Sequence, residues 1–183
     1  MRINNLVVGY LRTNCYLVES QGEIMVVDPG DNASHILENL KEMEGKVKYI
    51  VNTHEHYDHI KANDEIKEEA GGEILGIPEE GKEIRVGEEL FKVIATPGHS
   101  PKSITMVGND ILFTGDIIYR DRIGRTDLPG GSREDLEKTL KGMEEEYLAS
   151  GLKIYPGHSE PFDWTEEMRM ENYLIKPENY TQI

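Results

Sequence analysis

The chain has 183 residues, of which 37% are hydrophobic and 30% charged, with 20 Lys and Arg against 35 Asp and Glu. The formal charge of -15 argues against nucleic acid and anionic membrane surfaces as partners. A chain of this length can bury one sizeable hydrophobic core but is too short for two cores of that size. We therefore expect a single domain over residues 1–183.

Cysteine usage points to a reduced compartment. Cys15 is the only cysteine, so there is no internal disulfide framework, and a cytoplasmic setting is expected. Its position inside a strand-like run predicts a small buried thiol rather than a nucleophile. The N-terminus does not show the pattern of a signal peptide, and no apolar run approaches the roughly 20 residues that a spanning helix requires.

In chain order, the first part of the sequence predicts strands over residues 3–10, 14–19 and 23–27, a helix over 33–43, a strand over 47–52 and a helix over 60–70. Gly71 and Gly72 can end that helix. Short strands and turns follow over 73–87. The second part predicts strands over 90–96, 103–107 and 110–113, a long loop over 117–131, a helix over 133–148, a strand over 153–155 and a helix over 163–175. Trp164 in the last helix is interpreted as a packing residue.

The stretch Thr-His-Glu-His-Tyr-Asp-His at residues 53–59 follows the buried strand 47–52 and holds three of the six histidines. If residues 53–58 are extended, His54, His56 and Asp58 share one side. His59 then falls out of phase as the chain turns into the helix. This arrangement predicts two adjoining metal positions, one using His54 and His56, the other Asp58 and His59. The zinc-protease helix would need histidines four residues apart, which this stretch does not have after His54.

The other histidines follow the same rule. His99 comes after Pro-Gly at the end of a strand, His158 repeats that pattern, and Asp116 also follows an apolar run. Only His35, near the start of a helix, stands outside this pattern, and it is interpreted as a surface residue. One cation cannot use seven ligands, but two can if one carboxylate bridges them. The candidate metal ligands are His54, His56, Asp58, His59, His99, Asp116 and His158.

The pattern His-x-His-x-Asp-His at 54–59, with His99 in Thr-Pro-Gly-His-Ser, Asp116 in Phe-Thr-Gly-Asp and His158 in Tyr-Pro-Gly-His, resembles the metallo-β-lactamase superfamily. Within it, the segment Gly-Arg-Thr-Asp-Leu-Pro-Gly-Gly at 124–131 is similar to glyoxalase II, hydroxyacylglutathione hydrolase, and its short relatives. The resemblance implies an α/β (α+β) fold, a four-layer αβ/βα sandwich with the metals at one edge of the two packed sheets.

The resemblance also implies a division of the ligands. His54, His56 and His99 would hold one cation and Asp58, His59 and His158 the other, with Asp116 as the bridge. Two divalent cations, zinc in the first place and otherwise iron or manganese, would hold a bridging hydroxide that attacks a carbonyl carbon, and Asp58 would orient it. A thiolate leaves without much protonation, so the expected substrate is a small-molecule thioester such as a hydroxyacylglutathione.

Other functions stay open at this point. Persulfide dioxygenases resemble the same branch but use a single iron on two histidines and an aspartate, and other ester or β-lactam hydrolases share the fold. A purely structural metal module is disfavoured, because structural zinc sites use cysteine prominently. Three arginines in the 117–131 loop could form a patch for an anionic substrate, or pair with Asp121 and Asp127; they are Arg120, Arg122 and Arg125.

Overall fold

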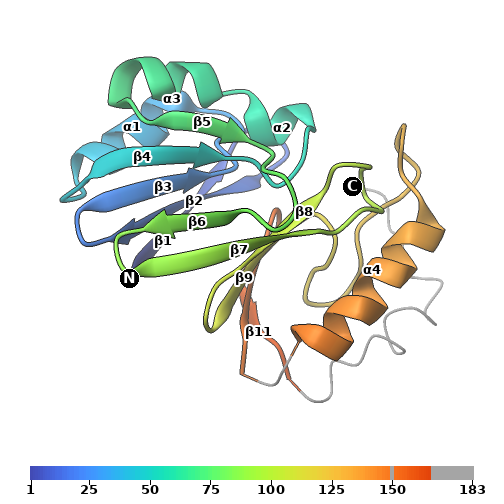
Figure 1. Ribbon diagram of the computed structural model, residues 1–183. Coiled ribbons are helices and arrows are strands. Elements are labelled where there is room, and N and C mark those ends of the chain that lie inside the picture. Colours follow the sequence, from blue (N-terminus) through green and yellow to red (C-terminus); the bar gives the residue numbers. More distant parts are fainter. Residues whose placement is uncertain (149–150, 166–183) are drawn as a thin grey trace.

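The structure is a computed structural model that describes residues 1–148 and 151–165. The strands form two sheets, one of five strands in the order β1-β2-β3-β4-β5 and one of six in the order β11-β10-β9-β8-β7-β6 (Figure 1). The elements are β1 (Arg2–Val8), β2 (Thr13–Ser20), β3 (Glu23–Val27), α1 (Ala33–Lys41), β4 (Lys46–Val51), α2 (Tyr57–Ile60), α3 (Asn63–Ala70), β5 (Glu73–Gly76), β6 (Glu83–Val86), β7 (Glu89–Ala95), β8 (Ile104–Val107), β9 (Ile111–Gly115), α4 (Arg133–Glu146), β10 (Lys153–Pro156) and β11 (Phe162–Asp163).

Four layers result from the packing of helices on the outer face of each sheet. Helices α1 and α3 cover the five-stranded sheet, and α4 covers the six-stranded sheet (Figure 1). Three buried clusters fill the spaces between the layers, one under α1 and α3, one between the sheets and one under α4. The predicted αβ/βα sandwich is therefore confirmed.

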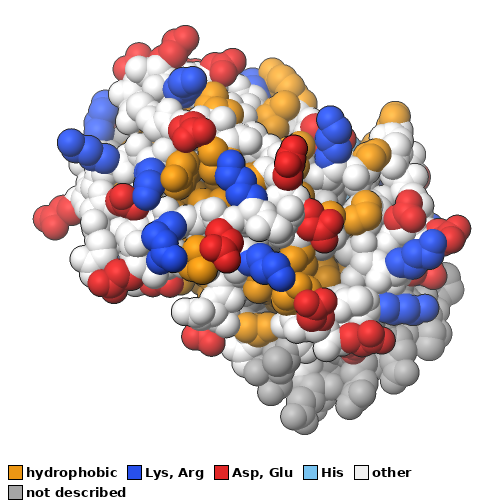
Figure 2. All heavy atoms as spheres, in the orientation of Figure 1, with side chains coloured by type: hydrophobic (Ala, Val, Ile, Leu, Met, Phe, Trp, Pro, Cys, Tyr) orange, Lys and Arg blue, Asp and Glu red, His pale blue; other side chains and the backbone are white. Residues whose placement is uncertain are grey.

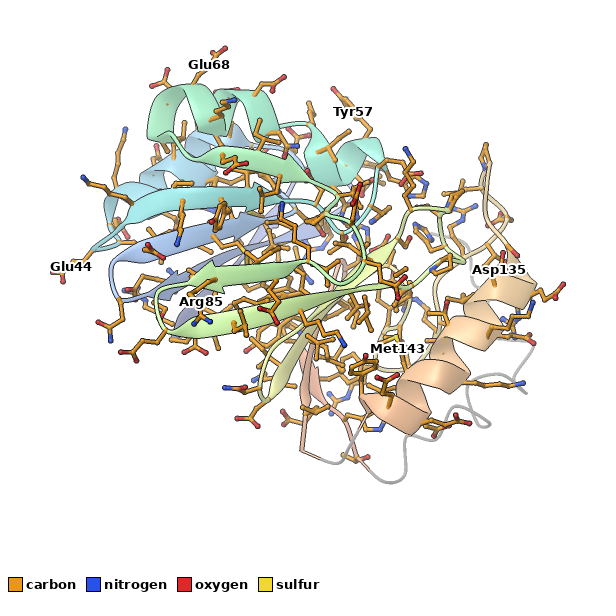
Figure 3. The ribbon with its side chains drawn as sticks, in the orientation of Figure 1. Glu44, Tyr57, Glu68, Arg85, Asp135 and Met143 are labelled. Atoms are coloured by element: carbon orange, nitrogen blue, oxygen red, sulfur yellow. The ribbon has the colours of Figure 1, made fainter. Side chains whose placement is uncertain are left out.

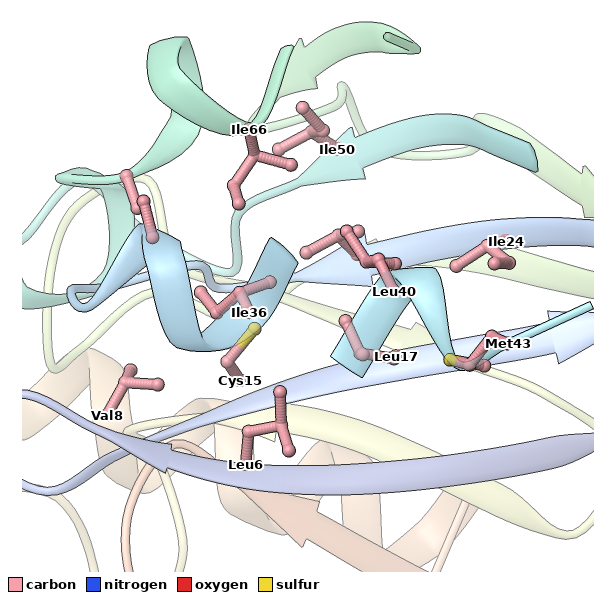
Figure 4. Close-up of a cluster of buried hydrophobic side chains, with 13 residues drawn as sticks. Leu6, Val8, Cys15, Leu17, Ile24, Ile36, Leu40, Met43, Ile50 and Ile66 are labelled. Carbon is pink, nitrogen blue, oxygen red and sulfur yellow. The ribbon is translucent and has the colours of Figure 1, made fainter. Parts of the chain in front are cut away.

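Alternation along the central strands explains why both faces of the five-stranded sheet are buried. In β2, Cys15 and Leu17 pack toward the helices, whereas Tyr16 and Val18 pack toward the other sheet. Cys15 is fully buried in the cluster shown in Figure 4, as predicted. Burial, followed by the nearby charge of Asp28, raises the pKa of its thiol well above the ordinary value, which suits a packing role.

The helix predicted over 60–70 is two helices, and the first begins earlier than expected. Helix α2 starts at Tyr57, after His56 in extended conformation, so Asp58 lies in a helical turn and not in an extended run. The amide of His59 donates to the carbonyl of His56 at 2.9 Å, and a second bond ties Ala62 to the carbonyl of Pro29. The assumed alternation therefore holds for His54 and His56 only.

The predicted helix over 163–175 is wrong at its start. Phe162 and Asp163 instead form β11, antiparallel to β10, and Trp164 continues the pairing by donating its amide to the carbonyl of Leu152 at 2.7 Å. Trp164 is buried, as expected of a packing residue. The remainder of that predicted helix lies outside the described residues. Within the residues that the structure describes, no helix is long and apolar enough to cross a bilayer.

Strand direction places several loop starts at one edge of the sandwich. Strands β3 and β4 are parallel, as are β9 and β10, and β7 runs in the same direction as β9 because β8 is antiparallel to both. The carboxyl ends of β7, β9 and β10 therefore lie at one edge of the six-stranded sheet, and the hydrogen bond from the Ile104 amide to the Thr53 carbonyl brings the end of β4 to the same edge. Acidic and basic side chains are interspersed over the face of the molecule seen in Figure 2.

Candidate metal centre

All seven predicted ligands follow the carboxyl ends of strands at this edge. The 54–59 stretch follows β4, His99 follows β7, Asp116 follows β9 and His158 follows β10. Their ligand atoms form three overlapping groups, each within 4.8 Å. The groups are His54, His56 and His99, then His54, His59 and Asp116, then Asp58, His59 and His158. We call His54, His56 and His99 the first ligand set. We call Asp58, His59 and His158 the second ligand set.

The first ligand set is a compact group of three imidazoles. His56 Nδ1 lies 2.8 Å from His99 Nε2. The ring of His54 lies nearly perpendicular to both, with ring centroids 4.7 and 4.9 Å away. Two nitrogens at this separation can share one proton, or both can point their lone pairs at a cation. The second arrangement gives three nitrogen donors converging on one point.

The second ligand set is linked to the first by Asp116. His158 Nε2 lies 3.4 Å from Asp58 Oδ2 and 3.3 Å from Asp116 Oδ2. His59 Nε2 lies 3.5 Å from Asp58 Oδ2 and 3.6 Å from Asp116 Oδ1. Asp116 Oδ2 is also 3.6 Å from His99 Nε2, so this carboxylate stands between the two sets.

Buried polar atoms without partners show that these residues suit divalent cations. His54 Nε2, His59 Nε2 and Asp116 Oδ1 are buried and have no hydrogen-bond partner within the described residues. Buried groups of this kind are normally satisfied, because leaving one unpaired costs about 1–3 kcal/mol. Neutral imidazole and carboxylate are the donors that zinc, iron and manganese accept. The donor set therefore fits a metal centre.

A buried carboxylate outside the ligand sets orients two of the histidines. Asp28 accepts hydrogen bonds from the amide and the hydroxyl of Thr53, both at 2.7 Å, and its Oδ2 lies 3.0 Å from His59 Nδ1. The Thr53 hydroxyl lies 3.1 Å from His54 Nδ1. With Nδ1 engaged in this way, Nε2 of both rings is left for a metal.

Further partners hold the remaining ligands. Thr13 donates its hydroxyl to Asp58 Oδ2 at 2.8 Å. The side-chain amide of Asn14 donates to the carbonyls of Pro156 and Ser159, on both sides of His158, at 2.9 and 2.6 Å. Sequence reasoning assigned no orienting role to Thr13, Asn14 or Asp28. The one signal for Asp28 was its place after β3, at the same edge as the ligands.

The two ligand sets differ in their protonation. Burial lowers the pKa of His54 and His56, and the neighbouring histidines lower them further. Burial also opposes the charge of His158, but Asp116 outweighs it and raises that pKa to about 10. The pKa of His59 is raised well above its usual value for the same reason, with Asp28 adding to Asp116. In the metal-free protein these shifts favour the protonated form of the two histidines of the second set and the neutral form of His54 and His56.

The two carboxyl groups of the centre, Asp58 and Asp116, have lowered pKa values. Burial by itself would raise the pKa of Asp58 and of Asp116. His158, His59 and the Thr13 hydroxyl together lower the pKa of Asp58, and the charges of His59 and His158 lower that of Asp116 well below its usual range. Both groups are therefore carboxylates at neutral pH and available as ligands.

Apolar side chains are exposed beside the second ligand set. Of the six exposed large hydrophobics among the described residues, three lie in β1 and the following turn, and a fourth, Tyr57, begins α2 and points outward (Figure 3). Tyr10 is 96% and Tyr57 68% exposed. A small pocket of about 150 Å³ between this turn and α2 is lined by both tyrosines, Leu11 and Asp58. The metal edge therefore offers apolar surface to an organic molecule.

The arginines of the 117–131 loop are engaged locally. Arg125 forms two hydrogen bonds to Asp127 at 2.7 and 2.8 Å, and Arg122 pairs with Asp121 at 3.3 Å. The carbonyl of Arg125 lies 2.8 Å from His99 Nδ1, which orients that ligand. Two of the three arginines therefore form the salt bridges to Asp121 and Asp127 that the sequence offered as the alternative to an anion-binding patch. His35 is exposed on α1, as expected.

A two-sheet αβ/βα sandwich with a histidine and aspartate cluster at the ends of its strands defines a class of metal-dependent enzymes, and sequence comparison specifies the family. The family model for the metallo-beta-lactamase superfamily matches residues 8–90 and 72–158. The chain belongs to the metallo-β-lactamase superfamily, and it is a metallohydrolase of that fold.

Several relatives and solved structures are similar to this chain over most of its length. An uncharacterized protein of Aquifex aeolicus is 34% identical over 86% of this chain and 90% of its own length. The hydroxyacylglutathione hydrolase GloC of Haemophilus influenzae is 26% identical over 95% of this chain and 98% of its own. Among solved structures, ETHE1 from Myxococcus xanthus superimposes with a TM-score of 0.84 at 27% identity, covering 98% of this chain and 85% of that one.

Proposed function

We propose that this chain is a dinuclear metallohydrolase that cleaves thioesters, of the glyoxalase II type. The observation that carries the proposal is the pair of complete ligand sets with Asp116 between them. Two divalent cations, zinc in the first place, would be held by the first set of His54, His56 and His99 and by the second set.

The residues of the two ligand sets would hold cations that supply a hydroxide at neutral pH and polarise the carbonyl under attack. The protein's own residues fix where this happens. Thr13 donates its hydroxyl to Asp58 Oδ2 and so holds the carboxylate that would orient the reacting water. The burial of His54, His59 and Asp116 keeps bulk water away from their ligand atoms, which strengthens electrostatic interactions at the site.

The substrate class follows from the leaving group and from the surface beside the site. A thiolate needs little protonation to leave, so the site does not require a strong general acid. The apolar turn 9–12 and Tyr57 provide contact area for an organic substrate, and a relative bearing the name hydroxyacylglutathione hydrolase spans nearly the whole chain. A small-molecule thioester such as a hydroxyacylglutathione is the proposed substrate, acted on by one domain in the cytoplasm without nucleic acid or membrane as partner.

The second candidate is a persulfide dioxygenase with a single iron. The similarity to the ETHE1 structure favours it, because that structure covers 98% of this chain. The complete second ligand set favours hydrolysis, since a protein with a single iron would not use the histidines of that set as ligands.

Metal analysis and two assays separate these candidates. The protein is loaded with zinc, iron or manganese, its metal content per chain is measured, and loss of S-D-lactoylglutathione absorbance is followed. Two metals and hydrolysis are expected, and Asp116→Ala should abolish turnover and loosen the second metal. One iron per chain, with oxygen consumed on a glutathione persulfide, would overturn the hydrolase proposal.

A further inference from the structure

His56 is the one histidine in the first ligand set whose ring has no orienting partner outside the ligands. Thr53 contacts the ring of His54, and the carbonyl of Arg125 contacts that of His99. In the described part of the chain, the only hydrogen-bond contact of the His56 ring is to another ligand, His99. The position of this ring therefore depends on its contacts with the rings of His54 and His99 and on the backbone that carries it.

Glu55 supplies a link from that backbone to the facing loop. It stands between His54 and His56 and is exposed, yet its carboxylate accepts a hydrogen bond from the buried Ser100 hydroxyl at 2.9 Å. Ser100 directly follows His99. The bond therefore joins the loop after β4, in the five-stranded sheet, to the loop after β7, in the six-stranded sheet.

The Ser100 end of this link is itself anchored. The Ser100 hydroxyl lies 3.1 Å from the hydroxyl of Ser103, which also accepts from the Ser100 amide at 3.2 Å. The next residue, Ile104, donates its amide to the carbonyl of Thr53 at 2.9 Å. Glu55 is thus tied to a braced turn, and a carboxylate acceptor makes that tie stronger than a neutral one.

We propose that Glu55 and Ser100 are positioning residues that clasp the two loops and so set the separation of His56 Nδ1 and His99 Nε2 for the first metal. In the described part of the chain neither Glu55 nor Ser100 forms a hydrogen bond or ion pair with the second ligand set, so the main effect is expected at the first metal position. The inference rests on the metal centre of the proposed function, but it does not depend on the substrate being a thioester.

The test is a double-mutant cycle read out as metal affinity. Zinc is titrated against a chelating dye into the metal-free wild type, Glu55→Ala, Ser100→Ala and the double variant, and both binding constants are determined. Each single change should weaken one constant about tenfold, as loss of an orienting partner does. The double variant should lose no more zinc affinity than the single variant that binds zinc less tightly. Glu55→Gln, which keeps an acceptor, should recover most of the affinity.

Glu68→Ala is the matched control, because Glu68 is an exposed carboxylate on α3 that points into solvent (Figure 3). It should leave both constants unchanged. Glu55 is also exposed, so Glu55→Ala should leave the melting temperature of the metal-free protein unchanged, which separates positioning from folding. Wild-type affinity in Glu55→Ala, or multiplicative losses in the double variant, would overturn the proposal. A wild type that binds two metals but hydrolyses no thioester would refute the proposed function and leave this result standing.

Discussion

Replacing Asp28 by Asn tests whether one buried carboxylate sets the histidine geometry. Asn has nearly the same size, and its oxygen can still accept from the Thr53 amide. Its NH2 group would then face His59 Nδ1 or the Thr53 hydroxyl, where the carboxylate now accepts. A metal requires the neutral form of the His59 ring. A donor facing that neutral ring makes Nδ1 an acceptor, so the one remaining proton sits on Nε2, the atom needed for the metal.

The expected size of the effect follows from the contacts that are lost. Loss of an orienting partner of a ligating histidine typically costs 10–100-fold in metal affinity. At about 1.4 kcal/mol per tenfold, this corresponds to about 1.4–2.8 kcal/mol. The weakening should be larger for the second metal, because Asp28 contacts His59 directly and reaches His54 only through Thr53.

The assay is a zinc titration of metal-free wild type and Asp28→Asn, with melting temperatures recorded alongside. Asp64→Asn, a change of the same kind at an exposed position on α3, is the control and should match the wild type. Asp28→Asn protein that folds and binds both metals with wild-type constants would refute the reasoning, since the tautomer of His59 would then not depend on Asp28.

Three further predictions concern the second ligand set. Thr13→Val should weaken the second metal about tenfold by removing the hydroxyl that holds Asp58, whereas Thr105→Val in β8 should not; dye competition distinguishes the two. Gly157→Ala should disrupt the second site, because a Cβ there would clash with Asp116 Oδ1 and lie 2.7 Å from His59 Cε1, while Gly142→Ala on α4 has open space and should bind metal normally. Because the pKa of His158 is raised to about 10, the second metal must displace a proton at pH 7. Calorimetry in buffers of different ionisation enthalpy should find this release, with affinity rising about tenfold per pH unit for each proton displaced between pH 7 and 10; equal affinity at both pH values would contradict it.

Most of the fold and the gathering of the candidate ligands at one edge could be predicted from local sequence. Each ligand follows an apolar run and a turn signal, and strand ends in a layered sheet gather at an edge, so His99 and His158 could be placed beside the 54–59 stretch without coordinates. The strands of the five-stranded sheet could also be predicted. Burial on both faces leaves an apolar run in the sequence, as in β2 and β3.

The parts that could not be predicted depend on contacts between distant elements. Asn14 and Pro156 are 142 residues apart, and Asp28 and His59 are 31 apart, so neither hydrogen bond has a local signature. The division between α2 and α3 likewise coincides with the bond from Ala62 to the carbonyl of Pro29, which belongs to another loop. At Asp163, the first residue of the predicted helix, pairing with β10 overrides a helical pattern.

The wide spacing of the candidate ligands along the sequence explains how metal binding and folding are linked in this chain. His54, His56, Asp58 and His59 come from the five-stranded sheet, whereas His99, Asp116 and His158 come from the six-stranded one. Each ligand set therefore contains residues of both sheets, and neither can form until the sheets have packed. A bound cation in either set would tie the two halves of the sandwich together at the edge where the buried clusters end. Its binding free energy then adds to that of the packed sandwich rather than to either sheet alone.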